Sequence, residues 1–298
     1  MVIRYSSGKI SVKCSKNSRI LVDDVNFDID DGETFALIGK TGSGKTMIAL
    51  SIMNLLPEDA VQTGGKFDFC GRFLTGESLQ ELLGNEIVYI PQSGGDYLNP
   101  TRTVKKQLAD SLKRLGFKGK DIKNRAIENL GKAGLSEPEK VMELYPFELS
   151  GGMAQRVTIA LALCSNAKLL ICDEATNGLN HEATKEFIFE INRLFPKASK
   201  LVITHDISVA KSCDKIGVLC EGKLLERGDA QSVLVSPKHP YTKSLINSLV
   251  KNGMEWLPIL RNDKCDCPFY SRCPSASERC LSEVPQKTDG VSMYRCVL

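Results

Sequence analysis

One short segment near the N-terminus, GKTGSGKT, limits the possible folds of this chain more than any other. It follows the apolar run TFALIG, which is typical of a buried strand, and it leads into the helical pattern of TMIALSIMNLL. The pattern G-x-x-x-x-G-K-[ST] between a strand and a helix predicts a phosphate-binding loop. We expect the residues of this phosphate loop to bind a nucleotide: Gly39, Lys40, Thr41, Gly42, Ser43, Gly44, Lys45 and Thr46.

The residue types in the loop suit this chemistry. Glycines let the backbone bend so that successive N–H groups point at phosphate oxygens, and the N-terminus of the following helix adds its positive end. Lys45 is expected to reach the β and γ phosphates, and the Thr46 hydroxyl to bind Mg²⁺.

Strand-like runs and helical patterns alternate along the chain, which indicates an α/β fold with a mostly parallel sheet covered on both faces. KIGVLCEGKLLERG predicts a hairpin that turns at Glu221 and Gly222, and residues 103–145 show helical periodicity. We therefore predict three parts: a nucleotide-binding core at 1–92 and 160–229, a helical subdomain at 93–159, and a C-terminal extension at 230–298 without a conventional core.

Charge and hydropathy exclude several classes of protein. The 298 residues carry 39 basic and 36 acidic side chains without long runs of like charge, so nucleic acid is not an expected partner. We see no secretory signal at the N-terminus. The longest apolar run, Val157–Cys164, is far shorter than the roughly 18 to 20 residues that span a bilayer. Any role at a membrane would come through a partner protein.

Two further segments carry the chemistry of a nucleotide site. LLICDE is an apolar strand that ends in two carboxylates, with Asp173 for the Mg²⁺ shell and Glu174 to polarise an attacking water. LSGGMAQR places Ser150, Gly151 and Gly152 at the start of a helix, where a second anion can bind. With the phosphate loop, these segments resemble the ATP-binding subunits of ABC transporters, in which this serine and these glycines form the signature motif.

The resemblance implies the ABC ATPase fold, with a RecA-like core, a β subdomain and an inserted helical subdomain, and it implies ATP and Mg²⁺ as ligands. Ser150, Gly151, Gly152 and Gln155 would then contact nucleotide. Gln92 matches the glutamine that contacts Mg²⁺ and the membrane subunit, and His205 matches the switch histidine that contacts the γ phosphate.

Two positions depart from the family pattern. Asn180 replaces the usual aspartate of the D-loop, which removes a charge from the dimer interface. The N-terminal window Ile10–Ser18 holds no aromatic residue to stack on adenine, and the nearest candidate is Tyr5.

The resemblance also implies partners, because the signature of one subunit covers the ATP on the phosphate loop of another. We expect a second ATPase subunit, identical or paralogous, two integral-membrane permease subunits, and an indirect link to an extracellular solute-binding protein. The chain would sit on the cytoplasmic face of the membrane. The rival interpretation is a soluble ABC ATPase that acts in translation or DNA repair.

The end of the chain narrows the resemblance. SPKHPYTKSLINS and CPFYSRCPSASERC are similar to segments of ATPases that power import of oligopeptides, dipeptides or nickel. Four thiols there could bind a [4Fe–4S] cluster, as in some relatives, or zinc, or no metal. Cys265 falls outside the pattern. The candidate ligands are Cys267, Cys273, Cys280 and Cys296.

The other six cysteines have apolar neighbours, and we expect each to be a small buried hydrophobic residue in a reduced state. They are Cys14, Cys70, Cys164, Cys172, Cys213 and Cys220.

Overall fold

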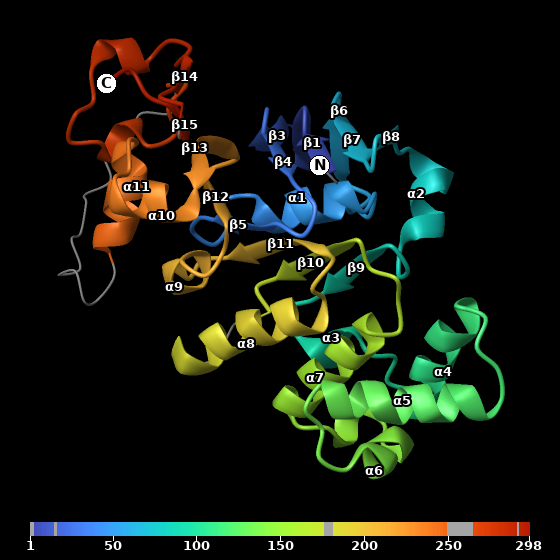
Figure 1. Ribbon diagram of the computed structural model, residues 1–298. Coiled ribbons are helices and arrows are strands. Elements are labelled where there is room, and N and C mark those ends of the chain that lie inside the picture. Colours follow the sequence, from blue (N-terminus) through green and yellow to red (C-terminus); the bar gives the residue numbers. More distant parts are fainter. Residues whose placement is uncertain (1–2, 15–16, 176–180, 249–264, 291) are drawn as a thin grey trace. The chain divides into compact units, whose positions relative to one another are not determined.

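The computed structural model describes the chain in five segments, which are residues 3–14, 17–175, 181–248, 265–290 and 292–298 (Figure 1). The chain divides into two compact units: Met1–Thr75 with Leu201–Leu298, and Gly76–Lys200. Asn180, the departure from the D-loop pattern, lies outside the described residues.

The first unit is built on a mixed sheet with the strand order β14-β15-β13-β12-β5-β11. Strands β5 and β11 are buried at every residue, as expected for strands covered on both faces. β12 runs parallel to β5 and antiparallel to β13. The bounds are β5 (Thr34–Ile38), β11 (Ser199–Thr204), β12 (Lys215–Cys220), β13 (Lys223–Asp229), β14 (Gln286–Thr288) and β15 (Ser292–Arg295).

The predicted hairpin is confirmed, since β12 and β13 are joined by Glu221 and Gly222, both with positive φ. Two smaller antiparallel sheets, β4-β1-β7-β8 and β3-β2-β6, complete the strands of this unit. Their bounds are β1 (Ile3–Ser6), β2 (Lys9–Cys14), β3 (Asn17–Asp23), β4 (Asn26–Ile29), β6 (Ala60–Thr63), β7 (Lys66–Phe69) and β8 (Arg72–Phe73). The helices of the unit are α1 (Lys45–Ile52), α9 (Ile207–Ala210), α10 (Ala230–Val235) and α11 (Pro240–Asn247), with 3₁₀ turns η3 (Tyr270–Arg272) and η4 (Glu278–Cys280).

The second unit combines a parallel strand pair with a group of helices. The strands β9 (Ile87–Ile90) and β10 (Leu169–Asp173) pair in parallel. Amphipathic patterns build the helices, as in α4, where Val104, Leu108 and Leu112 are buried on one face. The helices are α2 (Gly76–Leu82), α3 (Gly94–Tyr97), α4 (Val104–Arg114), α5 (Lys120–Lys132), α6 (Pro138–Glu143), α7 (Gly151–Ala162) and α8 (His181–Leu194), with the 3₁₀ turn η1 (Pro146–Glu148).

The C-terminal extension differs from the prediction, because it has a packed interior. Its last strand, β15, pairs antiparallel with β13 and so adds to the edge of the main sheet of its unit (Figure 1). Tyr241, Phe269 and Val284 of the extension are buried. Because β15 pairs with β13, the extension packs on an existing sheet and needs few apolar residues of its own to form a buried interior. The expectation of an extension without a core was therefore wrong.

The predicted burial of cysteines is confirmed at Cys164, Cys172, Cys213 and Cys220 and is wrong at Cys70. Cys70 is exposed because it sits in the turn between β7 and β8, where its φ is 54°. The side chain of Cys14 lies outside the described residues. In the described part of the chain, no helix has the length and apolar character needed to cross a membrane.

The aromatic cluster in the first unit should dominate its stability. Phe27 is 1% exposed and lies 5.2 Å from the Tyr5 ring and 5.0 Å from the Phe35 ring. Phe27→Ala is expected to lower the free energy of unfolding by about 3–5 kcal/mol, because it leaves a cavity among these rings. The control Phe189→Ala, at a ring that is 73% exposed, should change it by less than about 0.5 kcal/mol. Urea denaturation measures both, and equal losses would contradict the assigned core.

Candidate functional site: a phosphate loop, a strand-end carboxylate pair and a thiol cavity

The phosphate loop has a backbone that only glycine adopts easily. It connects β5 to α1, and Gly42 and Gly44 have φ values of 81° and 103°. A Cβ atom on Gly44 would lie 2.8 Å from the carbonyl oxygen of Leu21, so a side chain has no room there. The loop therefore turns tightly into the N-terminus of α1, as a phosphate site requires.

The side chains of the loop also fit a phosphate ligand. Lys45 is 5% exposed, and its Nζ donates to the carbonyl oxygens of Gly39 at 2.9 Å and Lys40 at 3.2 Å. The buried Ser43 hydroxyl is without a hydrogen-bond partner in the described structure. Thr46 is exposed on the first turn of α1.

His205 belongs to the same unit as the phosphate loop and directly follows β11. Its side chain is exposed. The next residue, Asp206, receives a 2.7 Å hydrogen bond from the Ser208 amide and so begins α9. The Asp206 amide in turn donates to the Thr204 hydroxyl at 3.0 Å. These bonds fix the backbone on both sides of His205.

In the second unit, β10 ends at the predicted carboxylate pair. Asp173 is 3% exposed, and its Oδ2 accepts a 3.1 Å hydrogen bond from the Tyr89 hydroxyl on β9. The Tyr97 hydroxyl donates to Tyr89 at 3.4 Å. Burial, followed by Tyr97 and the Asp173 charge, raises the pKa of Tyr89 far above its ordinary value, so Tyr89 remains a donor. Glu174 follows with a φ of 49°, which turns the chain at the end of the strand.

The signature segment begins α7 as predicted. The Ser150 hydroxyl accepts from the Met153 amide at 3.3 Å and caps the helix. Gly151 and Gly152 are exposed, and a Cβ on either would meet nothing within 4 Å, so the helix N-terminus is open to a ligand. The Gln155 side chain donates to the Pro91 carbonyl at 3.5 Å.

That last bond joins the signature helix to the segment of Gln92, which is exposed just after β9. A Cβ on Gly94 would lie 2.7 Å from the Ala154 carbonyl carbon, so this segment packs directly on α7. Sequence reasoning missed both Gly94 and Tyr89, because each acts through a contact with a distant part of the chain.

The candidate adenine-stacking residue, Tyr5, is 2% exposed. Its ring packs against Phe27, and its hydroxyl hydrogen-bonds with that of Ser51 at 2.8 Å. The ring therefore belongs to the hydrophobic core and has no face exposed to a base.

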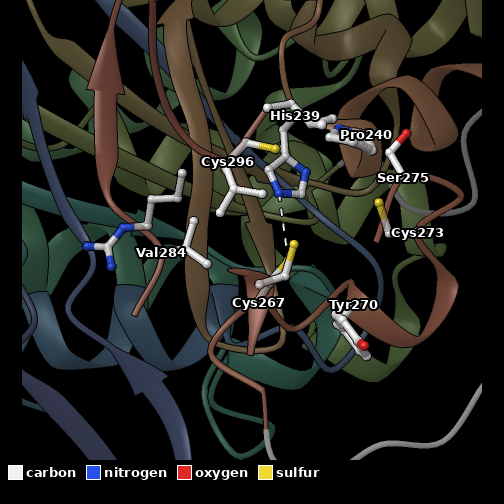
Figure 2. Close-up of a pocket in the computed structure, with 12 residues that line it drawn as sticks. His239, Pro240, Cys267, Tyr270, Cys273, Ser275, Val284 and Cys296 are labelled. Carbon is white, nitrogen blue, oxygen red and sulfur yellow. Dashed lines mark hydrogen bonds between the residues drawn. The ribbon is translucent and has the colours of Figure 1, made fainter. Parts of the chain in front are cut away.

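The four candidate cysteines line one cavity, which we call the thiol cavity and which His239 also lines (Figure 2). Cys265 is not among the lining residues; its thiol donates to the Cys267 carbonyl at 3.4 Å. Within the described segments, no three His, Cys, Asp or Glu side chains are close enough to hold a single metal ion. The lining cysteines are Cys267, Cys273, Cys280 and Cys296.

His239 is held in a defined orientation at the wall of the thiol cavity. Its Nδ1 accepts from the Tyr241 amide at 2.9 Å, and its Nε2 lies 4.0 Å from the Cys267 sulfur (Figure 2). The buried Glu226 carboxylate accepts from the Lys238 amide at 2.7 Å and the His239 amide at 3.0 Å. Sequence reasoning did not single out His239 as a cavity residue.

Burial disfavours the charged form of three side chains that line the thiol cavity, namely His239, Cys267 and Cys273. Burial lowers the pKa of His239 to about 4 and raises that of Cys267 to about 12. Burial also raises the pKa of Cys273, with a smaller contribution from Cys280 and Cys296. Thiolates are the metal-binding form, so a metal ion would have to supply the positive charge that ionises these groups.

Two family descriptions match the chain. Residues 22–177 match the family described as ABC transporter, and residues 225–280 match the family described as oligopeptide/dipeptide transporter, C-terminal region. A dipeptide transport ATP-binding protein from Escherichia coli (strain K12) is 35% identical over 280 residues, which cover 89% of this chain and 86% of the relative. An oligopeptide transport ATP-binding protein from Salmonella typhimurium is 36% identical over 281 residues, which cover 89% and 83%.

Solved structures support the fold. A dimeric bacterial ABC transporter cassette aligns with a TM-score of 0.67 at 25% identity, covering 76% of this chain and 98% of that chain. Part of an ABC transporter complex from Clostridium perfringens aligns with a TM-score of 0.65 at 20% identity, covering 83% of this chain and 94% of that chain.

The buried imidazole predicts a pH-dependent stability. Because the folded-state pKa of His239 is about 4, below the ordinary value of about 6.5, the unfolded chain takes up the proton first on acidification. Neutral His239 thus makes its full contribution to the free energy of unfolding above about pH 6.5. This contribution, about 3 kcal/mol in total, is lost as the pH falls towards about 4.

His239→Asn keeps an acceptor at the start of α11 and removes the titrating group. Denaturant unfolding of the metal-free protein between pH 7 and pH 4 should show a smaller loss of stability in this variant than in the wild type. Parallel pH profiles for the two proteins would show that His239 is not buried in its neutral form.

Proposed function

Because the chain belongs to the ABC transporter family of ATPases, we propose that it is the ATP-hydrolysing subunit of an importer for oligopeptides or dipeptides. The observation that carries this proposal is the match of residues 225–280 to the C-terminal region of oligopeptide and dipeptide transporters. The similar proteins from Escherichia coli and Salmonella typhimurium are transport ATP-binding proteins for dipeptides and oligopeptides, and the match extends over most of their length. Nickel or a metal chelate is the alternative solute.

The family pattern suggests the roles in hydrolysis that we propose for these residues. The amides of the phosphate loop and Lys45 would bind the phosphates of ATP. Thr46 and Asp173 would hold Mg²⁺, which supplies positive charge against the phosphate oxygens, and Gln92 would approach the same ion. Glu174 would orient and polarise the attacking water, and His205 would contact the γ phosphate.

The exposed N-terminus of the signature helix supports a role in a dimer. Ser150, Gly151, Gly152 and Gln155 stand at or near the open N-terminus of α7, and we propose that they bind the nucleotide held by a second ATPase subunit, either an identical chain or a paralogue. Closure on ATP and opening after hydrolysis would move two permease subunits between conformations. The chain would then be peripheral to the membrane on its cytoplasmic face, and a solute-binding protein outside the cell would deliver the peptide.

A second proposal concerns the thiol cavity, where we place a [4Fe–4S] cluster, with zinc as the alternative. Four thiols from separate parts of the extension converge on this one cavity. Four cysteine thiolates are a ligand set for either group. The metal content of the purified protein therefore decides between a cluster, zinc and no metal.

The role of Glu174 predicts a separation of binding from hydrolysis. Glu174→Gln should lower ATP turnover by at least about 100-fold, because the base that activates water is lost, while ATP binding and a closed dimer persist. Glu81→Gln on α2, an exposed carboxylate outside the site, is the matched control and should retain wild-type turnover. Phosphate release and nucleotide titration measure the two properties. Near-normal turnover in Glu174→Gln would refute its role.

The transport role itself is tested by the partners. Purification from membranes should recover the chain with two polytopic permease subunits, and dipeptide or oligopeptide should stimulate ATP hydrolysis in the reconstituted complex. Recovery with ribosomes or DNA instead would favour the soluble ABC ATPase.

The metal proposal predicts a defined composition. Anaerobic purification should yield about four iron and four sulfide per chain, and Cys273→Ser should reduce both, whereas Cys265→Ser should not. One equivalent of zinc would support the alternative ligand. Less than about a tenth of an equivalent of iron, sulfide and zinc would contradict a metal site.

A further inference from the structure

Two hydrogen bonds link the phosphate loop to distant parts of the chain. The Lys40 amide donates to the Tyr241 hydroxyl at 3.4 Å, and the Gly222 amide donates to the Ser43 carbonyl at 2.9 Å. Tyr241 belongs to the C-terminal extension, 201 residues along the chain from Lys40. The path of the loop is therefore set in part by the extension and in part by the β12–β13 turn.

Tyr241 is fixed firmly enough to position a loop. It is 2% exposed, and its ring meets the Phe269 ring edge-on, with centroids 5.3 Å apart. The Cys220 thiol at the end of β12 is a neighbour of its hydroxyl. Burial, with the neighbouring Cys220, raises the pKa of Tyr241 above its ordinary value, so the hydroxyl keeps its proton while it accepts from the Lys40 amide.

The second hydrogen bond leads back to the same part of the extension. Gly222 shares its turn with Glu221, whose carboxylate accepts from the Arg272 guanidinium at 3.0 Å. Arg272 lies over the Phe269 ring, 5.7 Å from its centroid. Both of these hydrogen bonds are thus linked to Phe269.

From this arrangement we infer that Tyr241 is a positioning residue for nucleotide binding, so that the C-terminal extension forms part of the ATP site. The inference rests on the proposed role of the phosphate loop. Lys40 precedes Gly42, Gly44 and Lys45, and its amide donates to Tyr241, so this hydroxyl would act on a bound nucleotide through the shape of the loop. ATP and ADP should therefore be affected by the same factor.

The test compares two tyrosines of the extension in the full chain. Tyr241→Phe keeps the ring and removes the hydroxyl, and it should weaken binding of both ATP and ADP about two- to tenfold, the effect of one neutral hydrogen bond. Tyr270→Phe is the matched control, because Tyr270 lines the thiol cavity and its hydroxyl makes no hydrogen bond within the described structure. Its nucleotide affinity should equal that of the wild type.

Calorimetric titration gives the two affinities, and thermal unfolding shows whether the fold is intact. Turnover at saturating ATP should stay within about twofold of the wild type, since the hydroxyl acts on binding. Unchanged affinity of Tyr241→Phe for both nucleotides would overturn the inference, as would a loss confined to ATP. If Tyr241→Phe unfolds, Phe269→Leu replaces it, and wild-type affinity in that variant would equally overturn the inference.

A Lys45→Ala variant separates this inference from the proposed function. Loss of nucleotide binding in Lys45→Ala with full binding in Tyr241→Phe would refute only the positioning role. Wild-type affinity in Lys45→Ala would instead refute the proposed phosphate loop itself.

Discussion

The positive φ angles of Gly42 and Gly44 are the constraint on which the nucleotide site depends. They allow the chain to leave the fully buried strand β5 and enter α1 within a few residues. Any Cβ at Gly44 would meet the carbonyl of Leu21 on β3. Gly44 therefore permits the turn and also lets β3 approach the loop. The same residue thus determines the shape of the loop and the position of the neighbouring strand.

The carboxylate pair in the second unit is supported in a different way. Asp173 is almost completely buried at the end of β10, where an ionised group needs compensation. The Tyr89 hydroxyl supplies one hydrogen bond, and Tyr97 supports Tyr89 in turn. The Oδ2 atom of Asp173 therefore accepts a hydrogen bond from within the protein. This bond orients the carboxylate that we propose as a magnesium ligand.

Local patterns explain what could be predicted from the sequence. The phosphate loop, the carboxylates after β10 and the cap at Ser150 are each defined by a few adjacent residues, and each forms where the pattern predicts. The contacts that were missed join distant residues: Tyr89 with Asp173 across 84 positions and Lys40 with Tyr241 across 201. No periodicity or motif reports such pairs, because they depend on how the strands are ordered.

The extension shows how such long-range contacts connect two kinds of chemistry. His239 lines the thiol cavity, and its Nδ1 accepts the amide hydrogen of Tyr241, whose hydroxyl receives the Lys40 amide. His239 thus borders the cavity, and Tyr241, which His239 holds, contacts the phosphate loop. Burial lowers the pKa of His239 and raises the pKa of Cys267 and of Cys273. A cation that ionises these two thiols would therefore act beside the residue that holds Tyr241. The side chain of Tyr241 thus connects His239 with the phosphate loop.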